Sequence, residues 1–170
     1  MRPWLPVALS SLASTSVLAA DLSVAVEIPK LSVAEYHRPY VAIWVEGADQ
    51  KVAANLAVWY ELKKANNEGQ KWLKDMRQWW RKSGRDLTMP MDGVSSATRP
   101  AGSHTLTISG TKSPLASLAP GSYQLVVEAA REVGGRELLR IPFDWPAAKP
   151  FTASAQGSSE LGKLTLTIAP

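Results

Sequence analysis

The sequence contains no cysteine among its 170 residues and only two histidines, His37 and His104. The absence of thiols excludes structural disulfides, cysteine-ligated zinc, iron–sulfur clusters and thiol nucleophiles. Two histidines are too few for a histidine-rich metal site. Any function must therefore be argued from local motifs, and no metal site is expected.

Net charge is also low, since 19 Lys and Arg stand against 15 Asp and Glu, a formal net charge of +4. That excess is far from the charge of a dedicated nucleic-acid-binding protein. Hydrophobic residues make up 45% of the chain, which predicts a globular core rather than disorder. A chain of this length predicts one domain.

A long apolar run occurs at the amino terminus, where residues 1–20 have the features of a secretory signal peptide. Arg2 supplies the positive start, the apolar stretch after it carries no charge, and the small residues Ala19 and Ala20 follow. Cleavage is expected after Ala19 or Ala20, leaving one domain over residues 21–170. An uncleaved anchor and a buried first helix are the alternatives, although a membrane span needs roughly 20 apolar residues. The sequence therefore predicts export to the periplasm.

Alternating apolar and polar residues predict strands through most of the mature chain. Gly134 and Gly135 form a two-residue hairpin signal between two of them. The expected strands are residues 22–28, 40–46, 52–62, 104–109, 123–132, 136–143 and 163–168. Short strands separated by Gly, Pro and Ser predict an all-β fold, an immunoglobulin-like antiparallel β-sandwich.

Residues 67–83 have helical periodicity instead and predict one amphipathic helix inserted into the sandwich. Asn67 is the expected N-cap and Gly84 the expected C′ residue. The apolar face consists of Trp72, Leu73, Met76, Trp79 and Trp80. We expect these tryptophans to be buried against the sandwich, and a ligand platform is the alternative interpretation.

Basic residues cover the other face of this segment, with eight basic residues and two acidic residues between Lys63 and Arg85. Such a face can dock an acidic partner, an anionic lipid surface or a phosphate. Lys74, Arg77 and Arg81 are the expected docking residues. An ordinary solvated helix face is the alternative.

The loop Asp92–Gly102, with the sequence DGVSSATRPAG, carries three hydroxyl groups among small residues. We expect it to be exposed, because it follows the helix and precedes a strand. Its hydroxyls belong to Ser95, Ser96 and Thr98, and Arg99 follows them.

Residues 92–98 resemble the acceptor sequence of periplasmic flavin transferases, Asp-x-x-Ser/Thr-Gly-Ala-Thr/Ser. The resemblance implies that a flavin transferase joins FMN from FAD to Thr98 through a phosphoester, with Asp92 as the leading acid and Arg99 available to pair with the phosphate. Ser96 stands where the pattern has glycine, and a left-handed backbone there would cost about 1–2 kcal/mol.

The mature chain also resembles an exported bacterial family known as domain of unknown function 2271. The matching stretches are YHRPYVAIWVE, LAVWYE, the pair Trp79–Trp80, DGVSSATRPAG and GSYQLVVEAAREVGG. The resemblance implies a periplasmic location and an association with flavin-linked electron transfer, with a membrane flavoprotein or haem protein as partner. The GSYQLVVEA segment is also similar to the closing hairpin of immunoglobulin-like domains in flagellar hook-cap proteins.

Two functions remain open from the sequence. One is a periplasmic accessory protein of a flavin-linked electron-transfer system, carrying FMN on Thr98. The other is a non-enzymatic docking module that binds a membrane redox partner through its basic helix. In a purely structural loop, Ser95 and Thr98 would satisfy backbone groups and Arg99 would pair with Glu128 or Glu132. An independent enzyme is not expected, since a hydrolytic triad would need a nucleophile elbow that the sequence lacks.

Overall fold

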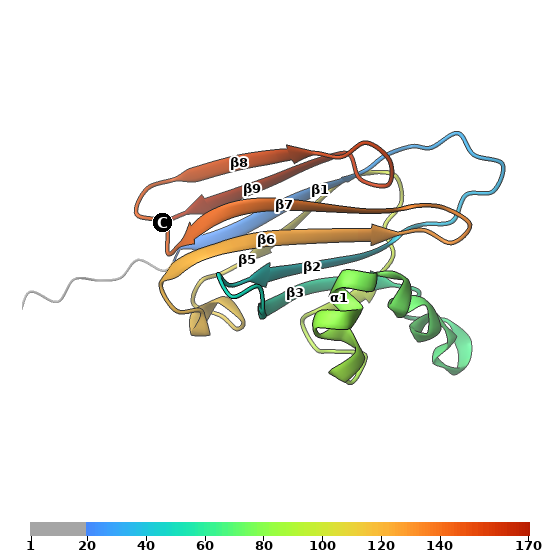
Figure 1. Cartoon of the computed structure of the whole chain (residues 1–170), viewed down its shortest axis with the longest axis horizontal. Helices are drawn as coiled ribbons and strands as arrows, with labels where there is room; N and C mark the ends of the chain where they lie inside the picture. The colour runs from blue at the N-terminus through green and yellow to red at the C-terminus, as the bar shows by residue number, and fades with distance from the viewer. Residues whose placement is uncertain (1–19) are drawn as a thin grey trace, which may run out of the picture.

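A computed structural model describes residues 20–170, which form two β-sheets packed face to face with helical segments on one outer face (Figure 1). The predicted signal peptide falls almost entirely on residues 1–19, outside the described residues. The strands are β1 (Asp21–Ile28), β2 (Tyr40–Glu46), β3 (Val52–Tyr60), β4 (Ser95–Ala97), β5 (Gly102–Ile108), β6 (Gly121–Ala130), β7 (Arg136–Trp145), β8 (Phe151–Gln156) and β9 (Lys163–Ala169). The predicted β-sandwich is confirmed.

One sheet has the strand order β5-β1-β9-β8 and the other the order β4-β3-β2-β6-β7. Neighbouring strands are antiparallel in both sheets, except that β4 runs parallel to β3. The seven predicted strands are present; residues 40–46 coincide with β2, and the other six strands have shifted ends. The short strands β4 and β8 lie at sheet edges and were not predicted.

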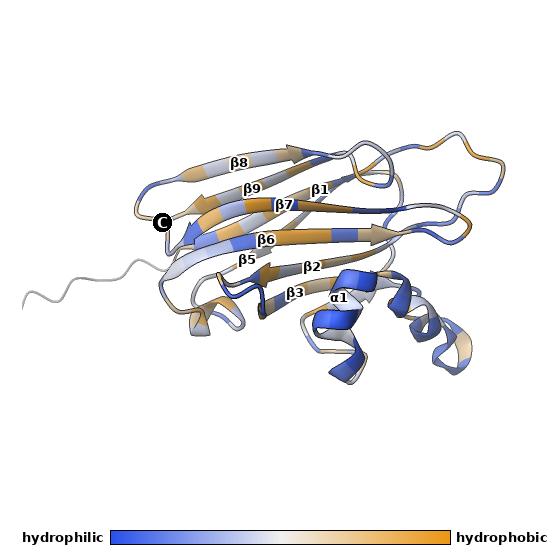
Figure 2. Ribbon diagram, viewed as in Figure 1, coloured by the Kyte–Doolittle hydropathy of each residue, from blue (hydrophilic) through white to orange (hydrophobic). Residues whose placement is uncertain are grey.

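Strand β2 is buried on both faces, which explains why its sequence is apolar at nearly every position. Val41, Ile43 and Val45 pack in the core between the sheets. Ala42 and Trp44 point the other way, into a second cluster beneath the helical segments. Apolar residues accordingly dominate the centres of β2 and β6 in Figure 2.

The predicted single helix over residues 67–83 is wrong in its continuity. The structure has a 3₁₀ segment, η1 (Ala65–Asp75), then the helix α1 (Arg77–Lys82), and then the short turns η2 (Gly84–Asp86) and η3 (Leu115–Ser117). Met76 breaks the segment with a ψ of 74°, and Asn67 has a left-handed φ of 56° instead of capping a helix. Gly84 does follow the C-cap residue Ser83, as expected.

A buried carboxylate explains where α1 begins. Glu128 on β6 is fully buried and accepts hydrogen bonds from the backbone N–H groups of Gln78 and Trp79, at 3.1 and 2.8 Å. These are N–H groups of the first turn, which no residue of the helix itself can satisfy. Arg136 on β7 pairs with the same carboxylate at 2.8 Å. The sheet therefore supplies the cap that the helix sequence lacks.

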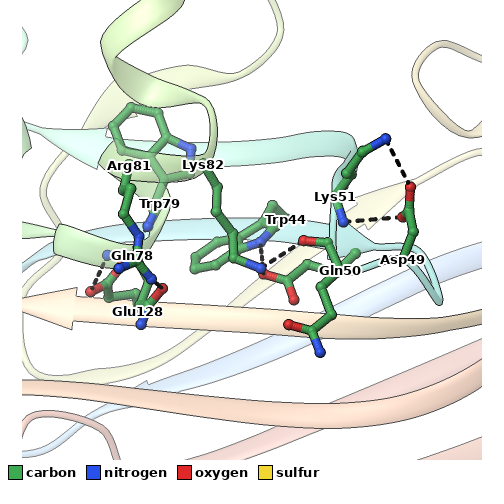
Figure 3. A network of polar contacts seen from close by, with 10 residues as sticks. Trp44, Asp49, Gln50, Lys51, Gln78, Trp79, Arg81, Lys82 and Glu128 are labelled. Carbon is green, nitrogen blue, oxygen red and sulfur yellow. Dashed lines mark hydrogen bonds and ion pairs between the residues drawn. The ribbon is translucent and has the colours of Figure 1, made fainter.

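The predicted burial of the tryptophan face is confirmed for Trp79, which is fully buried and donates its indole N–H to Asn55 at 2.8 Å. A second polar anchor joins Trp44 and Lys82, which Figure 3 labels. Glu46 is buried, accepts the indole N–H of Trp44 at 2.9 Å and pairs with Lys82 at 2.9 Å. The helical segments are thus fixed to the sheet by apolar packing and by two buried carboxylates.

The hydrogen bonds to Glu137 on β7 lead us to expect that the folded protein loses stability in acid. Partial burial raises the pKa of this carboxyl, but hydrogen bonds from the backbone of Leu161, Ser158 and Ser159 outweigh that effect and lower the pKa to about 2. Its stabilising contribution is therefore present above the ordinary pKa of 4.5 and is lost as the pH falls from there towards about 2. Glu137→Gln should cost about 1–2 kcal/mol at pH 7, allowing for solvent screening of a half-exposed group. Urea unfolding at pH 7 and pH 3 checks this, and an equal loss at both values would contradict it.

Candidate functional site

The segment expected to be a free loop is in fact held against the edge of a sheet. Residues 95–97 form β4, which pairs with residues 58–60 of β3. The backbone N–H of Thr98 extends the pairing by donating to the carbonyl of Tyr60 at 3.2 Å. The position of Thr98 is therefore fixed by the backbone of its neighbour.

Among residues 92–98, which carry the acceptor resemblance, the left-handed residue is Gly93 and not residue 96. Gly93 has a φ of 71° in the turn that leads into β4, a conformation that glycine adopts without steric cost. Ser96 lies in an extended strand. The expected strain of a serine at this position of the acceptor motif is therefore absent.

The three hydroxyl groups have different surroundings. The Ser95 hydroxyl accepts the backbone N–H of Met91 at 2.9 Å, which closes the turn. The Ser96 hydroxyl lies 3.5 Å from the guanidinium of Arg99. The Thr98 hydroxyl has no hydrogen-bond partner in residues 20–170, and Thr98 lines a cavity of about 180 Å³. Of the three, Thr98 has the hydroxyl least committed to holding the fold.

Aromatic and charged side chains from several segments line the Thr98 cavity. They are the aromatic residues Tyr36, Tyr40 and Trp72, the carboxylates Glu61, Asp75 and Glu132, and the bases His37 and Arg38. Burial raises the pKa of Tyr40 to about 12, and its hydroxyl donates to the carbonyl of Gly69 at 2.9 Å.

The charged groups around this cavity are partly paired with each other. Lys64 pairs with Glu61 at 2.9 Å, and its ammonium lies 4.8 Å from the centre of the Trp72 ring. The two ring nitrogens of His37 lie 2.8 Å from Glu35 and 3.6 Å from Glu132. His37 is thus a hydrogen-bonded corner of the chain, and in residues 20–170 no cluster of side chains has the composition of a metal site.

Asp92 and Arg99 lie away from this cavity. Asp92 is in the exposed turn before β4 and borders a different hollow. Arg99 lies over the ring of Trp59, 5.4 Å from its centre, in a separate groove. The alternative ion pairs of Arg99 are not formed, because Glu128 is paired with Arg136 and Glu132 lies beside His37.

The predicted docking residues Lys74, Arg77 and Arg81 are all exposed. Arg77 and Arg81 stand one turn apart on α1, and Arg81 bonds the amide oxygen of Gln78 at 2.7 Å. None of the three pairs with a carboxylate in the described part of the chain, whereas Lys71 pairs with Glu68 at 3.2 Å.

Sequence reasoning placed none of the other lining residues beside Thr98, and among those it missed are Tyr36, Arg38 and Glu132. They come from the connections between β1 and β2 and between β6 and β7. The only signal in the sequence was the polar run YHRPY immediately before a buried strand.

The fold defines a mostly β protein with two packed sheets and a helical cover on one of them. The chain belongs to the family described as predicted periplasmic protein (DUF2271), whose model matches residues 21–163. The protein is thus assigned to the periplasm, in agreement with the predicted export signal. No curated protein and no solved structure matches the chain. The helices found between residues 20 and 170 are too short or too polar to cross a bilayer.

Proposed function

We propose that the protein is a periplasmic accessory of a flavin-linked electron-transfer system and carries FMN on Thr98, as a redox carrier rather than an independent enzyme. The observation that supports this most directly is the uncommitted hydroxyl of Thr98, which lines a cavity shared with aromatic and charged side chains. In the attachment, the threonine oxygen forms a bond to the FMN phosphorus of FAD, the pyrophosphate bond breaks, AMP leaves and the hydroxyl loses its proton. A separate flavin transferase supplies the activation that a threonine hydroxyl needs.

The side chains around Thr98 fit a flavin in part. Tyr36 and Trp72 offer aromatic surface to an isoalloxazine ring, and Arg38 offers a cation to the linking phosphate. The three carboxylates of the same cavity oppose a phosphate, so the phosphate is expected at its open rim beside Arg38. The flavin, once bound, supplies the redox chemistry, and the protein supplies its position and electrostatic surroundings. Its electron partner would be a membrane flavoprotein or haem protein.

Three variants test the attachment by covalent flavin fluorescence after denaturing electrophoresis. Co-expression with a flavin transferase should give a fluorescent band in the wild-type protein and in Thr98→Ser, which keeps a hydroxyl. Thr98→Val has nearly the same shape without a nucleophile and should give none. Fluorescence that persists in Thr98→Val would assign the flavin to another residue.

The exposed cations favour a second candidate function, a non-enzymatic docking module for a membrane redox partner. Lys74, Arg77 and Arg81 present positive charge that no carboxylate within residues 20–170 neutralises. Electrostatic attraction of this kind mainly accelerates association and weakens with salt.

Reversing all three charges to glutamate should weaken association with an isolated membrane fraction by about tenfold or more at low salt. The same substitutions should change the unfolding free energy by less than about 1 kcal/mol, because the side chains are exposed. Co-sedimentation at low and high salt measures the effect. A matched control reverses Lys30, Lys112 and Lys149, which lie outside the helical segments, and equal loss in the control would exclude a specific basic face.

A further inference from the structure

A second groove, separate from the Thr98 cavity, lies between β4 and β5, which are edge strands of the two different sheets. Its volume is about 520 Å³. Among its lining residues are Ser96, Arg99, Ser103 and His104, and no Asp or Glu of the described chain lines it. The groove therefore has a guanidinium, an imidazole and hydroxyl groups, with no carboxylate among its lining residues.

Arg99 is the central charge of this groove and is held in place by its neighbours. Its guanidinium lies over Trp59, which is 3% exposed and so forms a rigid support. One of its nitrogens is 3.5 Å from the Ser96 hydroxyl. No carboxylate pairs with it in residues 20–170, whereas the more deeply buried Arg131 is paired with Glu160 at 2.8 Å. A half-buried, preorganised guanidinium without a counter-ion favours an incoming anion.

The remaining polar groups converge on the same groove. The His104 ring packs edge-on against Trp59, with centroids 6.0 Å apart. Its Nε2 donates a hydrogen bond to the carbonyl oxygen of Pro100 at 2.7 Å. Because a carbonyl oxygen can only accept, Nε2 carries the proton, and the bond holds the ring in one orientation. The hydroxyl of Ser96 lies beside the guanidinium, and Ser103 borders the groove from β5.

We propose that this groove binds the phosphate group of a small phosphorylated ligand, with Arg99 as its anchor. The planar guanidinium can hold two phosphate oxygens while the Ser96 hydroxyl donates to the third. The groove suits a doubly charged group better than the Thr98 cavity does, because three carboxylates line that cavity and none lines the groove. The site does not depend on a flavin at Thr98.

The test is a titration of the mature Thr98→Val protein, which has no attachment hydroxyl at residue 98, with inorganic phosphate and with phenyl phosphate at constant ionic strength. Amide and indole NMR signals report where binding occurs. Shifts should be confined to residues 93–105 and the Trp59 indole. Arg99→Gln should weaken binding about tenfold or more, and Arg99→Lys should weaken it less because it keeps the charge but not the planar fork.

Arg140→Gln is the matched control, since it removes an exposed arginine on β7, at the opposite edge of the sheet from β4, and it should leave phosphate binding unchanged. Ser96→Ala removes one hydroxyl and should weaken binding a few-fold, which keeps the test decisive if an Arg99 variant does not fold. Three results would overturn the proposal: no saturable shifts, equal shifts with sodium chloride, or equal affinity in the Thr98→Val protein with and without the Arg99 substitutions. Its failure would leave the covalent flavin proposal untouched, because the protein used carries no flavin at Thr98.

Discussion

Replacing Glu128 with alanine should destabilise the protein by about 3–5 kcal/mol, a large part of the 5–15 kcal/mol of a typical domain. The substitution leaves two backbone N–H groups of α1 without their acceptor and leaves Arg136 without its partner. Most of the cost comes from the two N–H groups, which are left without an acceptor against the sheet, because Arg136 is 38% exposed and can be hydrated. Chemical unfolding followed by circular dichroism gives the free energy directly.

Glu132→Ala serves as the control for Glu128, because Glu132 is on the same hairpin and its side chain is 47% exposed. It should cost less than about 1 kcal/mol. Glu128→Gln should fall between the two, since one amide oxygen can still accept a helix N–H. A loss below about 1 kcal/mol for Glu128→Ala would show that the helical segments do not depend on this anchor.

Trp79→Ala should cost about 3–5 kcal/mol, because the side chain is fully buried and leaves a large cavity. The ring also fills the space above Gly84, where an added Cβ would lie 2.6 Å from a ring atom, and its indole N–H satisfies Asn55. The shape of the cover over the sheet therefore depends on this one ring. Thermal and urea unfolding measure the loss.

The neighbouring Trp80 provides a matched comparison for Trp79. Trp80 is only half-buried, and its ring centre lies 6.3 Å from that of Trp79. Trp80→Ala should therefore cost about 2 kcal/mol less than Trp79→Ala. Equal losses in the two variants would mean that the helical segments do not pack on the sheet through Trp79.

The strands of the core could be predicted because their pattern repeats every two residues over seven or more positions, as in β1 and β9. The edge strand β8 has mostly small and polar side chains, FTASAQ, and gives no such signal. Strand β4 has three residues and forms only because β3 offers a free edge. Local sequence does not contain that information.

The break in the predicted helix has the same kind of cause. The α1 N-terminus is satisfied by Glu128, which lies 49 residues from Trp79 in the chain. Helix propensity depends only on residues that are close in the sequence, and on that basis Asn67 was expected to cap a continuous helix. The left-handed backbone of Asn67 instead turns the chain before η1 continues.

Only the part of the candidate site that lies within a sequence motif could be predicted. The motif singled out Thr98, and the structure gives the reason to prefer it over Ser95, whose hydroxyl holds the turn at Met91. The cavity around Thr98 was not predictable, because Arg38 and Glu132 reach it from connections far apart in the sequence. The placement of Arg99 beside Trp59 rather than beside Thr98 likewise depends on tertiary packing.

Intact mass spectrometry of the mature protein, purified from a periplasm that contains an active flavin transferase, tests the flavin proposal most directly. We predict a mass increase equal to FMN less one water, located by fragmentation on Thr98 within residues 92–99. Ser96→Ala should retain the increase and Thr98→Val should lose it. An unmodified wild-type mass under these conditions would contradict the proposal and leave the docking module as the better account.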